Sequence, residues 1–156
     1  MMVSFSARAE VRTVTFNGAF PEQKWPLADL AADFPTDWSG YDSLVIEMKA
    51  SSPQKFEIRI YTKAGMLKAH MQPFAGAWIR ASIPLALYKN LPTGTDLASV
   101  SNKPFPLFFI NLMGSHGPIN AVESLAVAME QPIGSPTVEI RSIQLSKEPV
   151  ASALLE

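Results

Sequence analysis

The segment at residues 43–62, SLVIEMKASSPQKFEIRIYT, decides the fold of this chain because apolar and polar side chains alternate on both sides of a short turn. A repeat of two residues is typical of a β-strand with one buried face, since successive side chains of a strand point to opposite sides. We therefore expect two strands, at residues 43–49 and 56–62. Their buried faces should carry Leu44, Ile46, Met48, Phe56, Ile58 and Ile60.

The turn at residues 50–55, ASSPQK, joins the two predicted strands. It contains a proline and two serines, and its length suits an antiparallel hairpin. The sequence therefore predicts that the two strands are neighbours in one sheet. Glu47 and Glu57 would then lie on the same outward face, together with Lys49 and Arg59.

The same alternation recurs along the rest of the chain. In residues 78–83 the apolar positions are Ile79, Ala81 and Ile83. Further strands are expected at residues 12–16, 66–72, 106–112, 122–129 and 137–145. In the last of these the apolar phase slips before Ile143, which predicts a β-bulge near Arg141 and Ser142.

Proline or glycine occurs in nearly every segment between the predicted strands, whereas helical signals are short. The clearest helical signal, at residues 27–34, has room for one or two turns before Pro35. Residues 89–105 are too long for a plain hairpin loop, so they are either functional or cross between sheets. Many short strands with regular turns are typical of sandwiches. We expect an all-β fold, an antiparallel β-sandwich of the jelly-roll type.

Composition excludes several classes of protein. The 156 residues include 13 basic and 14 acidic side chains, 47% apolar residues and no cysteine. This length can bury one hydrophobic core, so a single domain is expected. Without cysteine the chain has neither disulfides nor thiolate metal sites. A net charge of −1 gives no general basic footprint for nucleic acid, and no apolar run reaches the roughly 20 residues of a membrane-spanning helix.

Motifs for the common catalytic mechanisms are missing from the sequence. His70 and His116 occur without cysteine or a G-x-S-x-G turn, so zinc and serine hydrolase sites lack their parts. Glu47 and Glu57 form the one carboxylate pair worth naming for glycoside hydrolysis. A lysine and an arginine share their predicted face, however, which favours a solvated strand surface of mixed charge. We expect no catalytic activity.

The outward faces of three predicted strands combine aromatic and polar side chains. A sugar ring stacks its C–H face on tryptophan or tyrosine, and its hydroxyl groups need fixed donors and acceptors. The candidate ligand-binding residues on these faces are Glu57, Arg59, Tyr61, His70, Gln72, Trp78 and Arg80. Alternatively, Trp78 and Tyr61 pack beneath residues 89–105 while the charged groups form weak surface pairs. A site at the loop edge would instead involve Trp25, Asn102 and His116.

Two segments carry a resemblance to a known kind of domain. Residues 33–62, DFPTDWSGYDSLVIEMKASSPQKFEIRIYT, and residues 76–84, GAWIRASIP, resemble carbohydrate-binding-module-like jelly rolls of the galactose-binding-like kind. In those domains a W-S-G-Y segment introduces one core strand and a W-x-x-x-x-I-P segment introduces another. Independently of this resemblance, we expect Trp38 and Tyr41 to pack in the core, because they directly precede the strongest predicted core strand.

The later part of the chain extends this resemblance. It is similar to the module that precedes the catalytic barrel in β-agarase-like glycoside hydrolases, at residues 96–98 (DLA), Asn102, residues 117–118 (GP) and residues 133–145 (IGSPTVEIRSIQL). The resemblance covers roughly residues 10 to 148. It implies that residues 1–148 form one carbohydrate-binding-like domain, and that residues 149–156 are a tail or the start of a linker to a catalytic domain.

The resemblance also implies a function and a setting. The domain would be a non-catalytic module that targets or positions a polysaccharide-degrading, agarase-like glycoside hydrolase on its substrate. Its partners would be a galactan-type polysaccharide or oligosaccharide and the catalytic domain of the parent chain, with neither nucleic acid nor membrane. The alternative is a structural accessory domain that packs on the catalytic domain and has no sugar site.

Compartment and cofactors follow from the same resemblance. A secreted, periplasmic or cell-surface enzyme is implied, although the amino terminus, MMVSFSARAEV, lacks a signal-peptide pattern. A structural calcium ion is common in the wider group. No clustered run of aspartate or asparagine locates one here, because Asp37, Asp42 and Asp96 are scattered, and no cofactor is expected.

Overall fold

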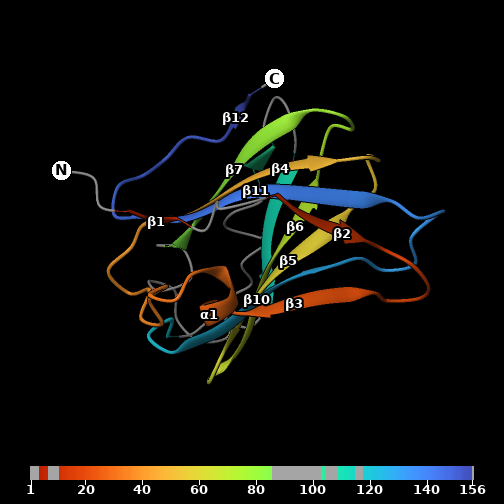
Figure 1. The fold of residues 1–156 in the computed structure, drawn as a ribbon. Helices are drawn as coiled ribbons and strands as arrows, with labels where there is room; N and C mark the ends of the chain where they lie inside the picture. The colour runs from red at the N-terminus through yellow and green to blue at the C-terminus, as the bar shows by residue number, and fades with distance from the viewer. Residues whose placement is uncertain (1–3, 7–10, 86–102, 105–108, 115–117, 156) are drawn as a thin grey trace.

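The computed structural model describes residues 4–6, 11–85, 103–104, 109–114 and 118–155. These residues form two antiparallel sheets that pack face to face, with one short helix, α1 (Leu27–Leu30), beside them (Figure 1). The predicted all-β sandwich is therefore confirmed. Among the described residues no helix combines the length and the apolar character needed to cross a membrane.

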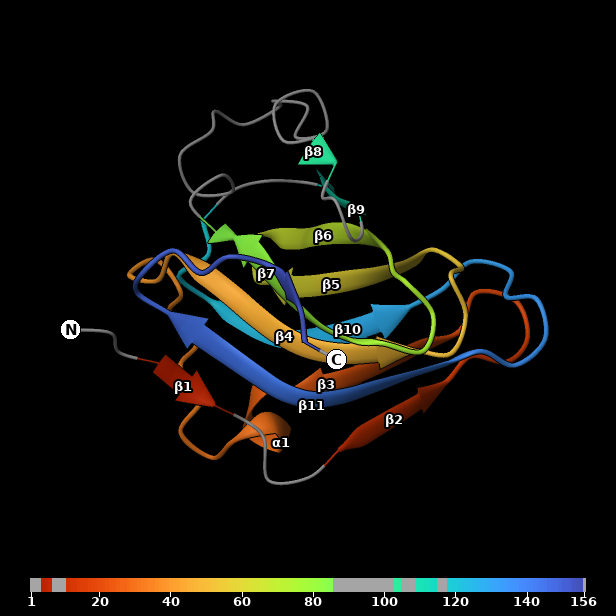
Figure 2. The same cartoon turned by 90° about the horizontal axis from the view of Figure 1, so that it is seen from above.

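Each sheet contains strands from distant parts of the sequence. Sheet A has the order β1 (Ser4–Ser6), β11 (Thr137–Ser146), β4 (Ser43–Ala50), β7 (Trp78–Pro84) and β12 (Ala153–Leu154), and β2 (Arg12–Thr15) also pairs with β11. Sheet B has the order β3 (Glu22–Pro26), β10 (Val122–Ala128), β5 (Phe56–Thr62), β6 (Gly65–Gln72), β9 (Phe109–Gly114) and β8 (Lys103–Pro104). The two sheets form the layers seen in Figure 2.

The hydrophobic core lies between the sheets and follows the predicted alternation. The apolar residues expected inside are 0–2% exposed, namely Leu44, Ile46, Met48, Phe56, Ile58, Ile60, Ile79 and Ile83. Trp38 is fully buried and Tyr41 is 8% exposed, so their predicted core packing is confirmed. The indole Nε1 of Trp38 also donates a hydrogen bond to the carbonyl of Pro35 at 2.8 Å, which satisfies its buried polar group.

The predicted hairpin between residues 43–49 and 56–62 is wrong. β4 pairs with β11 and β7 in sheet A, whereas β5 pairs with β10 and β6 in sheet B. The turn between them crosses from one sheet to the other, a distance of about 10 Å between packed layers. Both strands bury their apolar faces in the same core, but from opposite sides. The alternation of apolar residues is identical for this arrangement and for a hairpin.

Glu47 and Glu57 are separated by this crossover. Because β4 and β5 belong to different sheets and both glutamates point away from the core, the two carboxylates lie on opposite outer faces of the sandwich. They cannot act on one glycosidic bond. The two glutamates therefore do not form the carboxylate pair considered from the sequence.

The β-bulge predicted in residues 137–145 is confirmed. The register of β11 against β4 shifts between Ile140 and Ser142, which leaves Arg141 as the extra residue. Both neighbours of Arg141 in the sequence remain paired with β4. A bulge changes the direction in which the side chain of the extra residue points. The side chain of Arg141 accordingly lies on the outer face of sheet A.

Residues 149–156, assigned from the sequence to a tail or the start of a linker, include β12. Ala153 pairs with Arg80, and Leu154 pairs with Ile79 of β7. The Ser152 hydroxyl accepts a hydrogen bond from the Ser82 amide at 2.9 Å. The segment thus covers an edge of sheet A. Most of residues 89–105 lie outside the described residues, apart from the two that form β8.

Candidate ligand-binding site

The residues predicted to share one binding face are divided between the two sheets. Glu57, Arg59 and Tyr61 lie on β5 and His70 and Gln72 on β6, all in sheet B, whereas Trp78 and Arg80 lie on β7 in sheet A. Residues 73–77 cross between the sheets, as the turn before β5 does. Since both sets point outward, they occupy opposite faces of the molecule. The hypothesis of one face that contains all of these residues is wrong.

Glu57 is the centre of a charged cluster on the outer face of sheet B. Its side chain is only 6% exposed, and three cationic or ionisable side chains surround it. Arg59 Nε donates to Glu57 Oε1 at 2.8 Å, while Lys68 Nζ and His70 Nε2 lie 3.7 and 3.2 Å from Oε2. These three partners are each about a quarter exposed. Glu57 is therefore buried by polar neighbours and not by the apolar core.

The charge of Glu57 is stabilised by this cluster. Burial on its own would raise the pKa of the Glu57 carboxyl, because desolvation penalises the charged form. The hydrogen bond from Arg59 and the electrostatic interactions with Arg59, Lys68 and His70 outweigh burial, and the pKa lies below its ordinary value. Glu57 is thus ionised at neutral pH and presents fixed acceptor oxygens.

Arg59 extends the cluster across β10 to the edge strand β3. Its Nη1 lies 2.7 Å from Glu22 Oε2, and the Tyr61 hydroxyl donates to the same carboxylate oxygen. On β10, the outward positions opposite Arg59 and Glu57 are the small residues Ala126 and Ala128. Their methyl groups leave room for the arginine to cross, and both alanines are 0–2% exposed as a result. We call this contact from Arg59 to Glu22 the Arg59 bridge.

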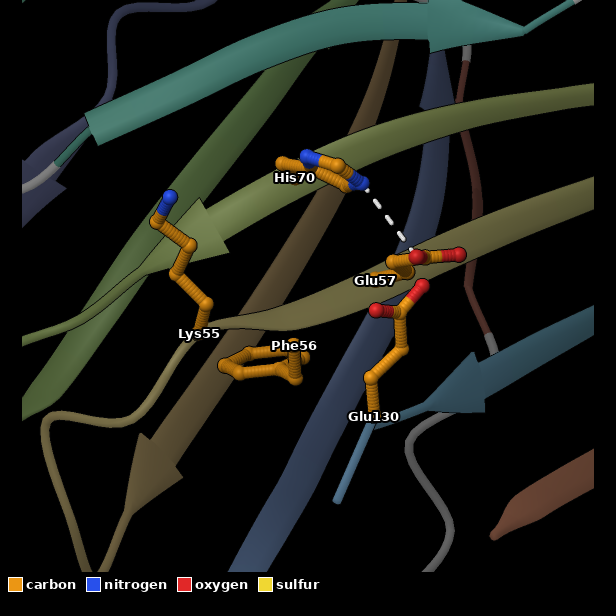
Figure 3. Close-up of a pocket in the computed structure, with 5 residues that line it drawn as sticks. All are labelled: Lys55, Phe56, Glu57, His70 and Glu130. Atoms are coloured by element: carbon orange, nitrogen blue, oxygen red, sulfur yellow. Dashed lines mark hydrogen bonds and ion pairs between the residues drawn. The ribbon is translucent and has the colours of Figure 1, made fainter. Parts of the chain in front are cut away.

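A pocket of about 300 Å³ lies beside the charged cluster, where β5 begins and β10 ends. Its lining residues are Lys55, Phe56, Glu57, His70 and Glu130 (Figure 3). Ala128 of β10 pairs with Glu57 of β5. Glu130 follows Ala128 by two residues and Lys55 precedes Glu57 by two residues, so both lie on the same outer face as Glu57. Figure 3 shows Lys55 on one side of the pocket and the two glutamates on the other, with His70 between them.

Lys55 and Glu130 were not predicted as site residues. Both belong to connecting segments next to strands, where the alternation of apolar and polar residues stops. They come together only because β5 pairs with β10, a contact between residues far apart in the sequence. No pattern in the sequence indicates that pairing.

Trp78, the expected stacking residue, has a different partner on the outer face of sheet A. The guanidinium of Arg141 lies 4.4 Å from the centre of the Trp78 ring. Glu47 Oε1 accepts a hydrogen bond from Arg141 Nε at 2.8 Å, which orients the guanidinium. The bulge allows Arg141 to reach across β4 to β7. Trp78 is half-buried in this arrangement.

Of the remaining candidate residues, those that the structure describes do not line the pocket. Trp25 on β3 is 9% exposed and packs in the core, with the Arg12 guanidinium 5.8 Å from its ring centre. Asn102 and His116, like Asp96, lie outside the described residues. Asp37 Oδ1 accepts hydrogen bonds from the Ser39 amide and hydroxyl and so shapes a turn. In the described part of the chain no three His, Cys, Asp or Glu residues gather as metal ligands would.

Comparison with known proteins identifies a similar fold. No protein-family model matches the chain, and no relative is found among curated proteins. The solved structure of PfGH50B superposes with a TM-score of 0.64 at 16% sequence identity. The match covers 96% of this chain and 23% of PfGH50B, so this chain spans less than a quarter of that protein. The name PfGH50B denotes glycoside hydrolase family 50, the agarase family. At this identity the likeness shows the fold.

Proposed function

We propose that this chain is a non-catalytic carbohydrate-binding module that positions a polysaccharide-degrading glycoside hydrolase on its substrate. The fold match carries the proposal, because nearly the whole chain corresponds to one part of a much longer glycoside hydrolase. A binding module of this kind acts by raising the effective concentration of its catalytic partner at the polysaccharide. The catalytic domain would lie in the same parent chain, in a secreted, periplasmic or cell-surface enzyme.

The pocket on sheet B supports the proposal chemically. A sugar hydroxyl both donates and accepts hydrogen bonds, so a sugar site needs both kinds of partner. Lys55 can donate, the Glu130 carboxylate can accept, and the ionised Glu57 is oriented by its hydrogen bond from Arg59. Both signs of charge line the pocket, which suits a neutral polyhydroxylated ligand. A galactan is the preferred class because of the resemblance to agarase-associated modules.

Affinity electrophoresis tests this function directly. The purified chain should migrate more slowly in native gels that contain agarose or porphyran than in gels that contain xylan or mannan. Glu130→Ala should reduce the retardation, since it removes an acceptor from the pocket. Glu139→Ala is the matched control, because Glu139 belongs to β11 in sheet A and pairs with Lys49 across the ladder. Mobility in all four gels equal to that in a gel without polysaccharide would refute carbohydrate binding.

A second function is favoured by the pairing of charges on sheet B. Glu22, Arg59 and Glu57 satisfy one another, as expected for a surface that supports packing and not for an open binding platform. The chain would then be a structural accessory domain without a sugar site. In that case no gel retards the protein, and removal of the domain from its parent enzyme lowers the melting temperature of the catalytic domain.

The non-catalytic assignment has its own test. Glu47 and Glu57 lie on opposite faces, so we expect the purified chain to release no reducing sugar from any of the four polysaccharides. Sugar release that is abolished by Glu57→Gln or Glu130→Gln would show that the pocket is an active site.

A further inference from the structure

The pocket is confined to one end of sheet B. The segment before β5 and the segment after β10 contribute Lys55 and Glu130, which stand on opposite sides of it (Figure 3). Its volume of about 300 Å³ is at the lower limit of sites that enclose a small ligand. Such a volume suits one sugar unit and not an extended stretch of polymer.

The face next to the pocket is closed on the β3 side. A binding groove for the interior of a polysaccharide needs an open path across several strands. Here the Arg59 bridge fills the part of that path that crosses β10, because the guanidinium reaches from β5 to Glu22 over Ala126 and Ala128. Lys24 Nζ also lies 3.8 Å from the centre of the Tyr61 ring, so this aromatic face is occupied. A chain that enters the pocket cannot continue along β10 without disrupting these contacts.

We propose that the pocket binds the terminal unit of a polysaccharide chain, so that the module recognises chain ends and not internal segments. This inference rests on the proposed carbohydrate-binding function. A terminal unit carries a hydroxyl group that an internal unit has committed to a glycosidic bond. Lys55 and Glu130, on opposite sides of the pocket, supply a donor and an acceptor for that group. The reducing and non-reducing ends of a galactan differ in chemistry. Each end nevertheless carries a hydroxyl group that is free of a glycosidic bond.

Counting binding sites per mass of polymer tests the inference. Agarose is partly hydrolysed to a series of mean lengths, and the amount of protein bound at saturation is measured at constant polymer mass. Chain-end binding predicts that the bound protein rises in proportion to the number of ends. Bound protein that depends on mass alone would overturn chain-end recognition while retaining the carbohydrate-binding function. Lack of binding to every sample would instead remove the proposed function itself.

Short oligosaccharides identify the end and the residues. We expect calorimetric titration with agaro-oligosaccharides to give one binding site per protein molecule. The affinity should rise with the length of the oligosaccharide only until its terminal part fills the pocket. Borohydride reduction of the oligosaccharide abolishes binding if the reducing end enters the pocket and leaves it unchanged if the other end does. Glu130→Ala should weaken binding about tenfold, equivalent to about 1.4 kcal/mol, and Glu139→Ala should not. An affinity that keeps rising with each added unit, or equal loss in both variants, would contradict the assignment.

Discussion

Glu57 combines deep burial with a full negative charge, which is unusual for a single side chain. An isolated buried carboxylate is costly, so it persists only where hydrogen bonds and opposite charges compensate for lost hydration. Arg59, Lys68 and His70 provide that compensation, each from the same outer face. Because these partners are about a quarter exposed, water screens part of the attraction, and the net stabilisation is modest.

Replacing Glu57 tests this balance through the pH dependence of stability. The pKa of Glu57 is lower in the folded chain than its ordinary value of 4.5, so its contribution is complete above pH 4.5 and is lost as the pH falls through the folded pKa. Glu57→Gln should reduce the free energy of unfolding at pH 7 by about 1–3 kcal/mol. Urea unfolding at pH 7 and at several values below 4.5 measures the difference.

The comparison is informative because the two proteins should converge in acid. The stability of the wild type falls as Glu57 is protonated, whereas the variant lacks this loss. Glu139→Gln, on the other sheet, serves as the control for a general change in net charge. A constant difference between wild type and Glu57→Gln at all pH values would show that packing and not charge is the cause.

Trp78 illustrates how a residue suited to sugar stacking can serve stability. Its ring lies under Arg141, and cation–π contacts contribute about 0.5–2 kcal/mol depending on desolvation. We expect Trp78→Ala to lower the free energy of unfolding by about 1–2 kcal/mol and to leave retardation in agarose gels unchanged. Arg141→Lys should lose less stability, because it keeps the charge without the planar stack. Lost retardation in well-folded Trp78→Ala would move the sugar site to sheet A.

At the scale of elements, alternation predicts faces but not partners. Each strand buries one side in a common core, so the inner residues of β4 and β5 are evident from the sequence alone. The same residues face the core whether the chain turns back within one sheet or crosses to the other sheet. The alternation therefore does not reveal the crossover after Ala50. β3 escaped prediction for another reason. This polar edge strand, EQKWP, contains one buried residue, Trp25, and its signal is too weak to recognise.

The candidate site could be predicted only in part for the same reason. Glu57 and His70 are on strands with clear alternation, and the structure places both in the pocket. Lys55 and Glu130 depend on the pairing of β5 with β10, which the sequence does not indicate. Trp78 is grouped with Glu57 and His70 in the sequence-based prediction because alternation does not distinguish the two sheets. Local periodicity thus identifies outward residues, and long-range topology decides which of them meet.

The central position of β5 gives a prediction for the core. Ile58 is fully buried between the sheets, so Ile58→Ala removes apolar contacts and leaves a cavity, at a cost of about 2–5 kcal/mol. Ile133→Ala is a suitable control, since Ile133 is 82% exposed and its truncation should change stability by less than about 0.5 kcal/mol. Chemical unfolding of the two variants measures both values. Similar losses would mean that the inner face of β5 is wrongly assigned.

In the whole molecule, four connections meet at the end of the sandwich that bears the pocket. They join β2 to β3, β4 to β5, β6 to β7 and β10 to β11 (Figure 2). The segment 51–55 is tied to the segment 129–136 and the start of β11. Ser51 exchanges hydrogen bonds with Thr137, and the Gln54 side chain pairs with the backbone of Ile133 at 2.8 and 3.1 Å. These ties hold the two segments that supply Lys55 and Glu130.

Gln54 is therefore expected to be a positioning residue for the pocket, although it does not line it. Gln54→Ala removes both hydrogen bonds to Ile133 and keeps the tie between Ser51 and Thr137, so the segment stays attached while its end near Lys55 gains freedom. Ordering that end on binding costs conformational entropy, at roughly 1–2 kcal/mol for each backbone residue that must be fixed. Affinity for agaro-oligosaccharides should fall several-fold, with little change in the free energy of unfolding.

Hydrogen exchange at the Ile133 amide separates positioning from a general loss of structure. In the wild type this amide donates to Gln54 Oε1, so Gln54→Ala should accelerate its exchange while the core amides of β5 stay protected. Ser135→Ala is the matched control, because it removes a hydrogen bond from the same segment to Asn17, away from Lys55. Faster exchange at Ile133 with unchanged affinity would mean that the tie does not position the pocket. Weaker binding with unchanged exchange would mean that Gln54 acts on the ligand directly.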